Sequence, residues 1–272
     1  MDGVRAGGSD GTPSAGEVKR CCARLYESDF AKLLLGDSFH PGGARLTTRL
    51  GELLHLAPGV RVLDVASGPG TSALVLAERF GADVLGVDLS ARHVDVANAE
   101  ASRRGLSHLV RFAVGDAERL PVADASFDVV VCECAFCTFP DKAAATREFS
   151  RVLKPGGRLG LSDITREVGP AGEFDDLMAW IACLADAMPA DAYAAWLREG
   201  GFGSTAVERH DEALMEMVKG VGTRLFAAEV LASLNKVDIA GVDLPAAKRL
   251  ARQAIDAVSH GRLGYAIVMA QR

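Results

Sequence analysis

The sequence predicts an α/β fold built around a doubly wound, mostly parallel sheet. Apolar runs of strand length alternate with segments of helical periodicity between residues 60 and 165. A glycine-rich turn follows the first apolar run, and acidic residues follow the next two. Alternating strands and helices of this length form parallel sheets with right-handed crossovers. Such sheets bind ligands at the carboxyl ends of their strands, where these polar residues would gather.

Five strands and three helices are predicted in this core. The strands are the apolar runs at 60–65, 84–88, 109–114, 127–134 and 158–164, and helices are expected at 71–80, 90–104 and 142–153. Asp141 occupies the N-cap position of the third helix, because its carboxylate can accept from a free backbone amide. The turn Lys154-Pro155-Gly156-Gly157 is expected to end that helix before the fifth strand.

Further elements flank the core. Apolar residues recur at helical spacing from Val18 to Leu34, and a second helix is predicted at about 44–56. After the core, the pattern predicts a helical stretch at 173–200, a strand at 206–209, helices at 211–234 and 246–260, and a strand at 263–269. Asp243 and Pro245 mark the start of the last helix.

The chain is expected to divide into four parts. They are a disordered leader (1–16), an N-terminal helical cap (17–57), a cofactor-binding core (58–165), and substrate-side helices with C-terminal strands of the same domain (166–272). The leader combines five glycines with few apolar side chains, so it cannot bury enough surface to fold. We expect the helices at 17–35 and 173–200 to cover the ligand site and exclude water.

The composition is typical of a globular protein with a small-molecule partner. Of 272 residues, 49% are hydrophobic, which is enough to bury a core without disulfides. A net charge of −6 without a basic cluster argues against a nucleic-acid partner. The sequence contains no apolar stretch of membrane-spanning length and no signal-peptide pattern, so no membrane partner is expected. We expect a cytoplasmic monomer or homodimer whose six cysteines are reduced.

The turn after the first strand is the most informative feature. Glycines at 68 and 70 allow the backbone to turn sharply and to approach a ligand, and Asp64 precedes them. Asp88 ends the second strand twenty positions after Gly68, a spacing at which a carboxylate can bind ribose hydroxyls. Asp116 follows the third strand, so three carboxylates are expected at one edge of the sheet.

This set of motifs resembles the class I S-adenosylmethionine-dependent methyltransferases, whose first motif has the form acidic-x-x-x-Gly-x-Gly. The resemblance covers most of residues 60–165 and includes 114–121, 126–129 and 151–157. It implies a seven-stranded, Rossmann-like methyltransferase sheet with an antiparallel last strand. It also implies S-adenosyl-L-methionine as cofactor, S-adenosyl-L-homocysteine as product and a small-molecule methyl acceptor. The candidate cofactor-binding residues are Asp64, Ala66, Gly68, Gly70, Thr71, Asp88, Leu89, Asp116, Ala117 and Glu133.

In this resemblance, Gly68 and Gly70 approach the methionine part of the cofactor, Asp88 holds the ribose, and Asp116 and Ala117 lie beside the adenine. An alternative is a nicotinamide-dependent oxidoreductase that uses the same turn. It is disfavoured because Ala73 replaces the third glycine of the dinucleotide fingerprint.

The end of the fourth strand carries Cys132, Cys134 and Cys137, close to the expected ligand edge. Strand alternation predicts that Cys132 and Cys134 share one face and that Glu133 points to the other. Two interpretations stay open, because free cysteine is readily buried in a core and also binds soft metal and metalloid centres.

This region resembles the arsenite methyltransferases, in which a cysteine shortly before Pro-Asp-Lys binds trivalent arsenic. Cys134 occupies that position, Cys183 matches a second family cysteine, and Cys22 could supply a third thiol. Three thiolates would leave the arsenic lone pair free to attack the methyl group, so no general base is needed. Asp186 departs from the small residues that follow the second family cysteine.

The main alternative is methyl transfer to oxygen, nitrogen or carbon of an organic metabolite. An acceptor proton must then leave, and the candidate bases are His40 in the loop before the second helix and Glu133. A third possibility is a protein that binds a metalloid through its thiols without turnover.

Overall fold

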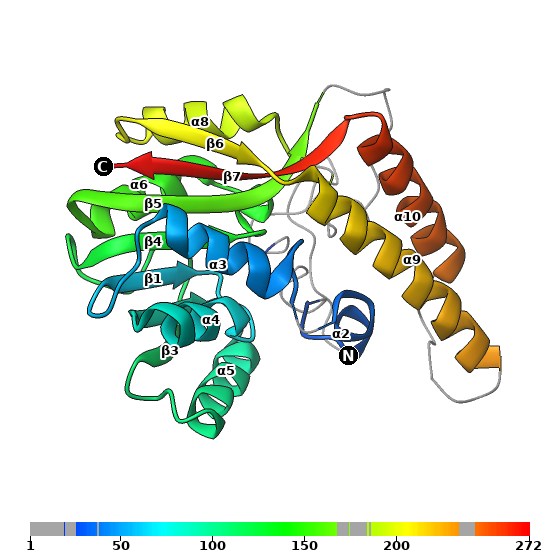
Figure 1. Cartoon of the computed structure of the whole chain (residues 1–272), viewed down its shortest axis with the longest axis horizontal. Helices are drawn as coiled ribbons and strands as arrows, with labels where there is room; N and C mark the ends of the chain where they lie inside the picture. Colours follow the sequence, from blue (N-terminus) through cyan, green and yellow to red (C-terminus); the bar gives the residue numbers. More distant parts are fainter. Residues whose placement is uncertain are drawn as a thin grey trace, which may run out of the picture.

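A seven-stranded sheet forms the centre of the part of the chain that the structure, a computed structural model, describes. The described residues are Lys19, 26–36, 38–167, Phe174, Leu184, 186–233 and 243–272. The strand order is β3-β2-β1-β4-β5-β7-β6 (Figure 1). The strands are β1 (Arg61–Val65), β2 (Asp83–Asp88), β3 (Val110–Val114), β4 (Phe127–Glu133), β5 (Leu153–Arg166), β6 (Thr205–Arg209) and β7 (Leu263–Gln271).

Strands β1 to β5 pair in parallel, whereas β7 runs antiparallel to both β5 and β6. The predicted doubly wound sheet with an antiparallel last strand is therefore confirmed. The order reverses between β1 and β4, because β2 and β3 extend to one side of β1 and β4 lies on the other. Ligands bind at this kind of reversal in open α/β sheets.

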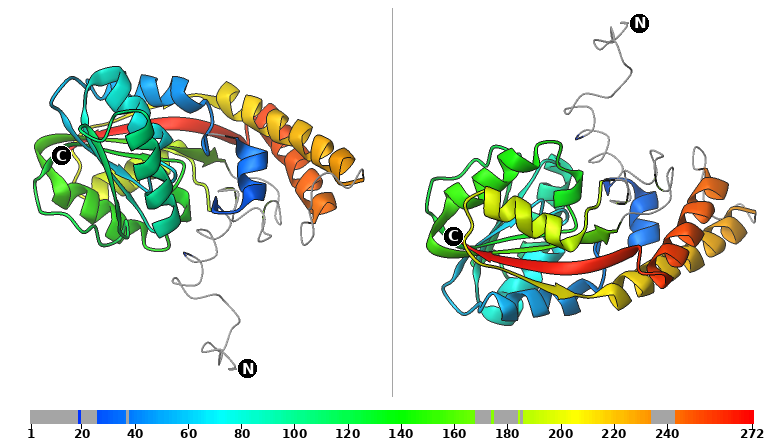
Figure 2. Two further views of the ribbon diagram at one scale, coloured as in Figure 1. Left: turned by 90° about the horizontal axis from the view of Figure 1, so that it is seen from below. Right: turned by 90° about the horizontal axis from the view of Figure 1, so that it is seen from above.

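Helices cover both faces of the sheet (Figure 2). They are α2 (Asp29–Leu35), α3 (Gly43–Leu53), α4 (Thr71–Phe80), α5 (Ala91–Arg103), α6 (Lys142–Val152), α8 (Ala190–Glu199), α9 (Asp211–Ser233) and α10 (Leu244–Ser259). Strand β4 shows how two cores arise, since Val130 packs with α6 and α8 while Val129 and Val131 pack with α3, α4 and α5. Both faces of β4 are buried, as expected for a central parallel strand.

Local capping explains why several helices start where the sequence predicted. Ser90 accepts a hydrogen bond from the backbone nitrogen of His93 at 3.0 Å and begins α5. Asp141 caps α6, and Asp243 caps α10. Each cap satisfies a backbone amide that lacks a partner inside the helix.

The structure corrects the predicted start of the fifth strand. Strand β5 begins at Leu153, which pairs with Phe127, whereas pairing was expected to begin at Arg158. Between these positions the register shifts, so the predicted turn at 154–157 is an irregularity within the strand. Extra residues of this kind are accommodated as a bulge when the pairing on both sides is retained.

The helices on either side of the core match their predicted bounds only in part. Helix α3 ends at Leu53, three residues before the expected end. Within the described residues the first helix is α2, which begins at Asp29. The leader at 1–16 and most of the stretches at 17–25 and 168–185 lie outside the described residues.

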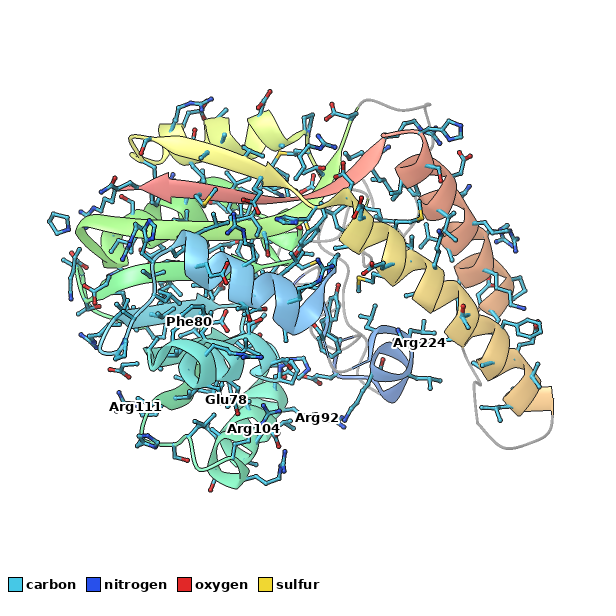
Figure 3. All side chains as sticks on the ribbon, viewed as in Figure 1. Glu78, Phe80, Arg92, Arg104, Arg111 and Arg224 are labelled. Carbon is cyan, nitrogen blue, oxygen red and sulfur yellow. The ribbon has the colours of Figure 1, made fainter. Side chains whose placement is uncertain are left out.

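Helices α9 and α10 form a hairpin that projects beyond the sheet (Figures 1 and 2). Helix α2 lies against α9, and Arg224 extends from α9 toward α2 (Figure 3) and donates a hydrogen bond to the carbonyl oxygen of Leu34 at 2.6 Å. None of the helices described here is both long enough and apolar enough to cross a membrane.

Candidate active site

A cavity lies at the carboxyl ends of β1, β2 and β4, beside the loop that follows β3. Its empty volume, which includes the open mouth, is about 1130 Å³. Nine of the ten predicted cofactor-binding residues line it, namely Asp64, Ala66, Gly68, Thr71, Asp88, Leu89, Asp116, Ala117 and Glu133. His40 and Cys134 line the same cavity, so the predicted cofactor and acceptor residues share one space.

Gly70 is the one predicted cofactor-binding residue that does not line the cavity. It is buried behind the cavity wall with φ of 88°, and a Cβ there would lie 2.6 Å from Cζ of Phe112 and 2.8 Å from Cβ of Ala97. Glycine is required here by the left-handed backbone and by this close packing. Gly70 therefore sets the path of the turn, while Gly68 lies on the cavity wall.

Asp88 joins the second strand to the glycine-rich turn. Its Oδ2 accepts a hydrogen bond from the backbone nitrogen of Gly68 at 2.8 Å, and its Oδ1 accepts from that of Ser90 at 2.9 Å. Each carboxylate oxygen keeps a further lone pair that can accept from a ligand hydroxyl. The position suits the predicted contact with ribose.

Asp64 is a buried carboxylate at the edge of the cavity. Its side chain is fully buried, and burial, followed by the charges of Glu133 and Asp88, raises its pKa well above the usual value. Its Oδ2 and the hydroxyl of Ser67 have no hydrogen-bond partner among the described residues. Because buried polar atoms are normally satisfied, this pair fits a ligand with a cationic or hydrogen-donating group, such as the ammonium of a methionine moiety.

The opposite end of the cavity is bounded by Asp116 and Lys19. The ammonium group of Lys19 lies 2.8 Å from Oδ2 of Asp116 and 2.5 Å from Oε2 of Glu118. Burial opposes the charge of Lys19, but these two carboxylates outweigh it and raise the lysine pKa. A residue N-terminal to the core therefore reaches the predicted adenine end.

A buried hydrogen-bond network links His40 to Glu133. Oε2 of Glu133 accepts from the Thr47 hydroxyl at 2.9 Å and lies 3.7 Å from Nε2 of His40. Nδ1 of His40 donates to the carbonyl oxygen of Pro41 at 3.1 Å, and Nε2 lies 3.3 Å from the Ser72 hydroxyl. With Nδ1 protonated, Nε2 is the nitrogen that can take up a proton.

The network continues through the sheet. Oε1 of Glu133 accepts from the hydroxyl of Ser162 at 3.3 Å, and Ser162 accepts from the hydroxyl of Tyr265 at 2.9 Å. Three hydroxyl groups thus connect the carboxylate to α3, β5 and β7. Hydrogen bonds of this kind fix the orientation of side chains that are largely buried from water.

The three cysteines after β4 occupy different environments, and the prediction that Cys132 and Cys134 share a face is wrong. Cys132 is buried in the core under α6 and α8, where burial raises the pKa of its thiol well above the usual value. Strand β4 ends at Glu133, and Cys134 has a left-handed φ of 53°. The alternation breaks at this turn, so Cys134 lines the cavity together with Glu133.

Cys137 is also buried, in a cluster with Leu184 against which Cys134 packs. Cys22 and Cys183, the other predicted thiol ligands, lie outside the described residues. In the described part of the chain, no three histidine, cysteine or acidic residues are grouped as a metal site. Of the thiols described, Cys134 alone lines the cavity.

Several cavity residues were missed by the sequence reasoning. They include Lys19, Tyr26, Phe39, Ser72, His93 and Phe139. His93 follows Asp88 by five positions at the start of α5, and Ser72 lies in the first turn after the glycine motif. Helix N-termini after parallel strands face the ligand edge, so polar residues in these first turns were detectable as candidates. Lys19 and Phe39 come from segments whose docking depends on tertiary structure.

Comparisons with known proteins show the family of this chain. A family model described as a methyltransferase domain matches residues 63–161. The 27-O-demethylrifamycin SV methyltransferase of Amycolatopsis mediterranei (strain S699) is 33% identical over 196 residues, covering 66% of this chain and 72% of the relative. The arsenite methyltransferase of Aquipseudomonas alcaligenes is 40% identical over 157 residues, covering 54% and 45%. The chain spans about half or less of the length of the first curated relatives that it matches.

Solved structures share the fold. The [4+2]-cyclase SpnF matches with a TM-score of 0.75 at 25% identity, covering 96% of this chain and 97% of that one. A phosphoethanolamine N-methyltransferase of Haemonchus contortus, in complex with phosphomonomethylethanolamine and S-adenosylhomocysteine, matches with a TM-score of 0.77 at 19% identity, covering 96% and 60%. The nicotinamide alternative is set aside by these findings. The chain belongs to the class I S-adenosylmethionine-dependent methyltransferases.

Proposed function

We propose that the protein transfers a methyl group from S-adenosylmethionine to a small-molecule acceptor within this cavity. The observation that carries this proposal is the buried Oδ2 of Asp64, for which the described part of the chain offers no hydrogen-bond partner, at the motif where the family binds its cofactor. Asp64 would hold the cofactor's ammonium, Asp88 its ribose, and Asp116 and Ala117 its adenine. The bound cofactor supplies a methyl group on a positively charged sulfur, which is already a good leaving group.

The contribution of the protein is then mainly positioning. The glycine-rich turn fixes one end of the cavity, and Cys134, Thr138 and Phe139 form the wall beyond it. Holding an acceptor in line with the methyl carbon and the sulfur lowers the barrier without acid or base chemistry. Tyr26 and Phe39 line the same cavity and would reduce the access of water.

For the acceptor we propose trivalent arsenic bound through thiolates. Cys134 is turned out of the strand into the cavity, at the position that matches the arsenic-binding cysteine of the family. Soft sulfur ligands suit a soft, thiophilic centre. The arsenic lone pair would form a bond to the methyl carbon while the carbon–sulfur bond breaks and leaves its electron pair on sulfur. Cys183 and Cys22 are the further thiols in this proposal.

A second candidate is methyl transfer to an oxygen, nitrogen or carbon atom of an organic metabolite. The observation that favours it is the buried approach of His40 Nε2 to Glu133 Oε2 at 3.7 Å on the cavity wall. In this case His40 would accept the acceptor proton at Nε2, and Glu133 would stabilise the resulting imidazolium. The rifamycin methyltransferase relative acts on an organic molecule, as its name states.

One assay distinguishes the candidates. Methyl transfer is measured by mass spectrometry with arsenite and with a panel of phenols and amines, for the wild type, Cys134→Ser, His40→Gln and the control Cys132→Ala. If arsenic is the acceptor, Cys134→Ser loses roughly tenfold or more of the arsenite activity, whereas Cys132→Ala retains it. Equal arsenite methylation by Cys134→Ser contradicts the thiolate proposal.

The other outcomes are also informative. Turnover of a phenol or amine that His40→Gln abolishes and Cys134→Ser preserves favours the second candidate. Arsenite binding without any methylated product indicates a metalloid-binding protein. Calorimetry that detects no binding of S-adenosylmethionine or S-adenosylhomocysteine contradicts the methyltransferase proposal itself.

A further inference from the structure

A fully buried tyrosine is connected to the cavity wall through one serine. Tyr265 in β7 packs in a hydrophobic cluster that includes Ile164 and Leu263. A phenylalanine would suit these surroundings, because a buried hydroxyl costs free energy unless it forms a hydrogen bond. The Tyr265 hydroxyl donates to the hydroxyl of Ser162 at 2.9 Å, and this contact offsets that cost.

Ser162 lies beside the point at which the cavity wall leaves the sheet. It pairs with Glu133 in the register of β4 and β5, and its backbone carbonyl accepts from the nitrogen of Cys134 at 2.6 Å. Its side-chain hydroxyl donates to Oε1 of Glu133 at 3.3 Å. A serine hydroxyl has one proton and rotates to suit its partners. Because Tyr265 donates to the oxygen of Ser162, the serine proton is directed to Glu133.

The direction of donation is set by Tyr265. Burial, followed by the charges of Cys134 and Glu133, raises the pKa of Tyr265 well above the usual value, so the hydroxyl keeps its proton. The backbone nitrogen of Tyr265 donates to Oδ1 of Asp211 at 3.0 Å, and its carbonyl oxygen accepts from the nitrogen of His210 at 2.7 Å. The first donor of the chain is therefore fixed in both position and protonation.

The last member of the chain is a carboxylate whose two oxygens have separate partners. Oε1 of Glu133 accepts from Ser162, whereas Oε2 lies 3.7 Å from Nε2 of His40. The terminal torsion of a glutamate has only a broad preference of its own, so its hydrogen bonds decide how the carboxylate is turned. Loss of the Ser162 donor would free this rotation and change the position of Oε2 relative to His40.

We propose that Tyr265 is a positioning residue, which acts through Ser162 to hold Glu133 with Oε2 directed at Nε2 of His40. The inference deepens the second candidate function and rests on it, because Glu133 can stabilise a proton taken up at His40 only in a suitable orientation. Tyr265 does not line the cavity, so its effect passes through the two side chains between them.

The experiment compares Tyr265→Phe and Ser162→Ala with a matched control, Tyr193→Phe. Tyr193 is also buried, and its hydroxyl donates to the backbone carbonyl oxygen of Ile164 at 2.8 Å. Its substitution therefore removes a buried tyrosine hydroxyl that is not part of the chain to Glu133.

Two of the measurements need no methyl acceptor. Calorimetry of S-adenosylhomocysteine binding reports that the cofactor site is folded. NMR of the histidine ring nitrogens, assigned with His40→Gln, reports the surroundings of His40 Nε2. The NMR measurement is repeated for Tyr265→Phe in a Glu133→Gln background, which tests whether Tyr265 acts through the carboxylate. In parallel, kcat and KM are measured for each phenol or amine of the panel that the wild type methylates.

We expect S-adenosylhomocysteine affinity close to that of the wild type in Tyr265→Phe, Ser162→Ala and Tyr193→Phe. The His40 Nε2 resonance should move in the first two variants, in the same direction as in Glu133→Gln, and stay in place in the third. Adding Tyr265→Phe to Glu133→Gln should move it no further. For a phenol or amine substrate, kcat should fall about tenfold in Tyr265→Phe with little change in KM, as for the loss of one hydrogen bond.

Three results overturn the positioning role. They are a His40 resonance at the wild-type position in Tyr265→Phe, an equal change in Tyr193→Phe, and a loss of S-adenosylhomocysteine affinity in Tyr265→Phe. A protein that shows the expected NMR changes but methylates arsenite and no phenol or amine overturns His40 as the base, while the positioning of Glu133 by Tyr265 stands.

Discussion

The carboxylate of Asp88 accepts a 2.8 Å hydrogen bond from the backbone nitrogen of Gly68. The residue expected to bind ribose thus also fixes the glycine-rich turn that would contact the methionine part of the cofactor. Two recognition elements that are twenty residues apart are coupled through one side chain. Changes at Asp88 should therefore affect cofactor affinity through both.

Substitution Asp88→Ala should weaken S-adenosylhomocysteine binding by about 10- to 100-fold, because hydrogen bonds to a charged group are lost at the ligand and at the turn. Isothermal titration calorimetry measures the change. The control is Asp83→Ala at the start of the same strand, where the carboxylate forms only long, exposed pairs with Arg61 and Arg111. Affinity of Asp88→Ala close to that of the wild type would contradict the assigned role.

Asp64→Asn should stabilise the free protein while weakening cofactor binding. Burial raises the pKa of Asp64, so the folded state retains its proton after the unfolded chain has lost it. This contribution to stability is present below the unfolded pKa near 3.8 and declines as pH rises. Urea unfolding at pH 8 should show a gain of about 1 kcal/mol for Asp64→Asn, and the difference should shrink toward pH 4.

Asp64 should also make cofactor binding depend on pH. An ammonium group beside Asp64 favours the carboxylate, so cofactor binding should release a proton and strengthen as pH rises through the raised pKa. Calorimetry in two buffers with different ionisation enthalpies detects that proton, and Asp64→Asn should abolish the buffer dependence. Identical binding enthalpies in both buffers for the wild type would exclude this coupling.

Gly70→Ala tests the packing of the turn. The added Cβ would strain the left-handed backbone at residue 70. It would also overlap with Phe112 and Ala97. Gly105 supplies the control, since its φ is 70° and a Cβ there meets no atom within 4 Å. Gly105→Ala should lose about 1 kcal/mol of unfolding free energy from backbone strain alone, and Gly70→Ala about 2 kcal/mol more. Equal losses in chemical denaturation would show that the overlap is relieved without cost.

The sequence predicted those features that depend on local chemistry. Helix α4 spans the predicted residues, and the predicted caps Asp141 and Asp243 begin their helices. Ser90, predicted as the first residue of its helix, is the N-cap of α5. Strand periodicity and capping act over a few residues, so a single sequence contains them. The order of the carboxyl-end residues Asp64, Asp88 and Asp116 then follows from the parallel topology.

Features that depend on distant contacts were not predictable. Thr47 donates to Glu133 across 86 residues, and Lys19 reaches Asp116 across 97. The direction of the Cys134 side chain depends on a left-handed residue at the end of β4, whereas strand alternation alone placed it with Cys132. A local pattern cannot specify such pairings, because they follow from how complete elements pack.

Because of His93, we expect the folded protein to lose stability at alkaline pH. Its Nδ1 lies 3.6 Å from Oδ1 of Asp88, and its Nε2 lies 3.3 Å from the carbonyl oxygen of Tyr26. Both partners accept hydrogen bonds, so the doubly protonated ring satisfies both. Burial opposes this charge, but Asp88, the Tyr26 carbonyl and the nearby charge of Glu27 outweigh it and raise the pKa of His93.

Because the folded pKa lies above the unfolded value of about 6.5, the stabilisation is complete below that pH and is lost as pH rises through the folded pKa. Urea unfolding between pH 6 and 9 should therefore show a decline for the wild type that is reduced in His93→Gln. The control His108→Gln removes an exposed histidine and should keep the wild-type slope. If the wild type and His93→Gln lose the same amount of unfolding free energy as pH rises, then the charge of His93 does not hold the segment at Tyr26 to the cofactor-binding edge.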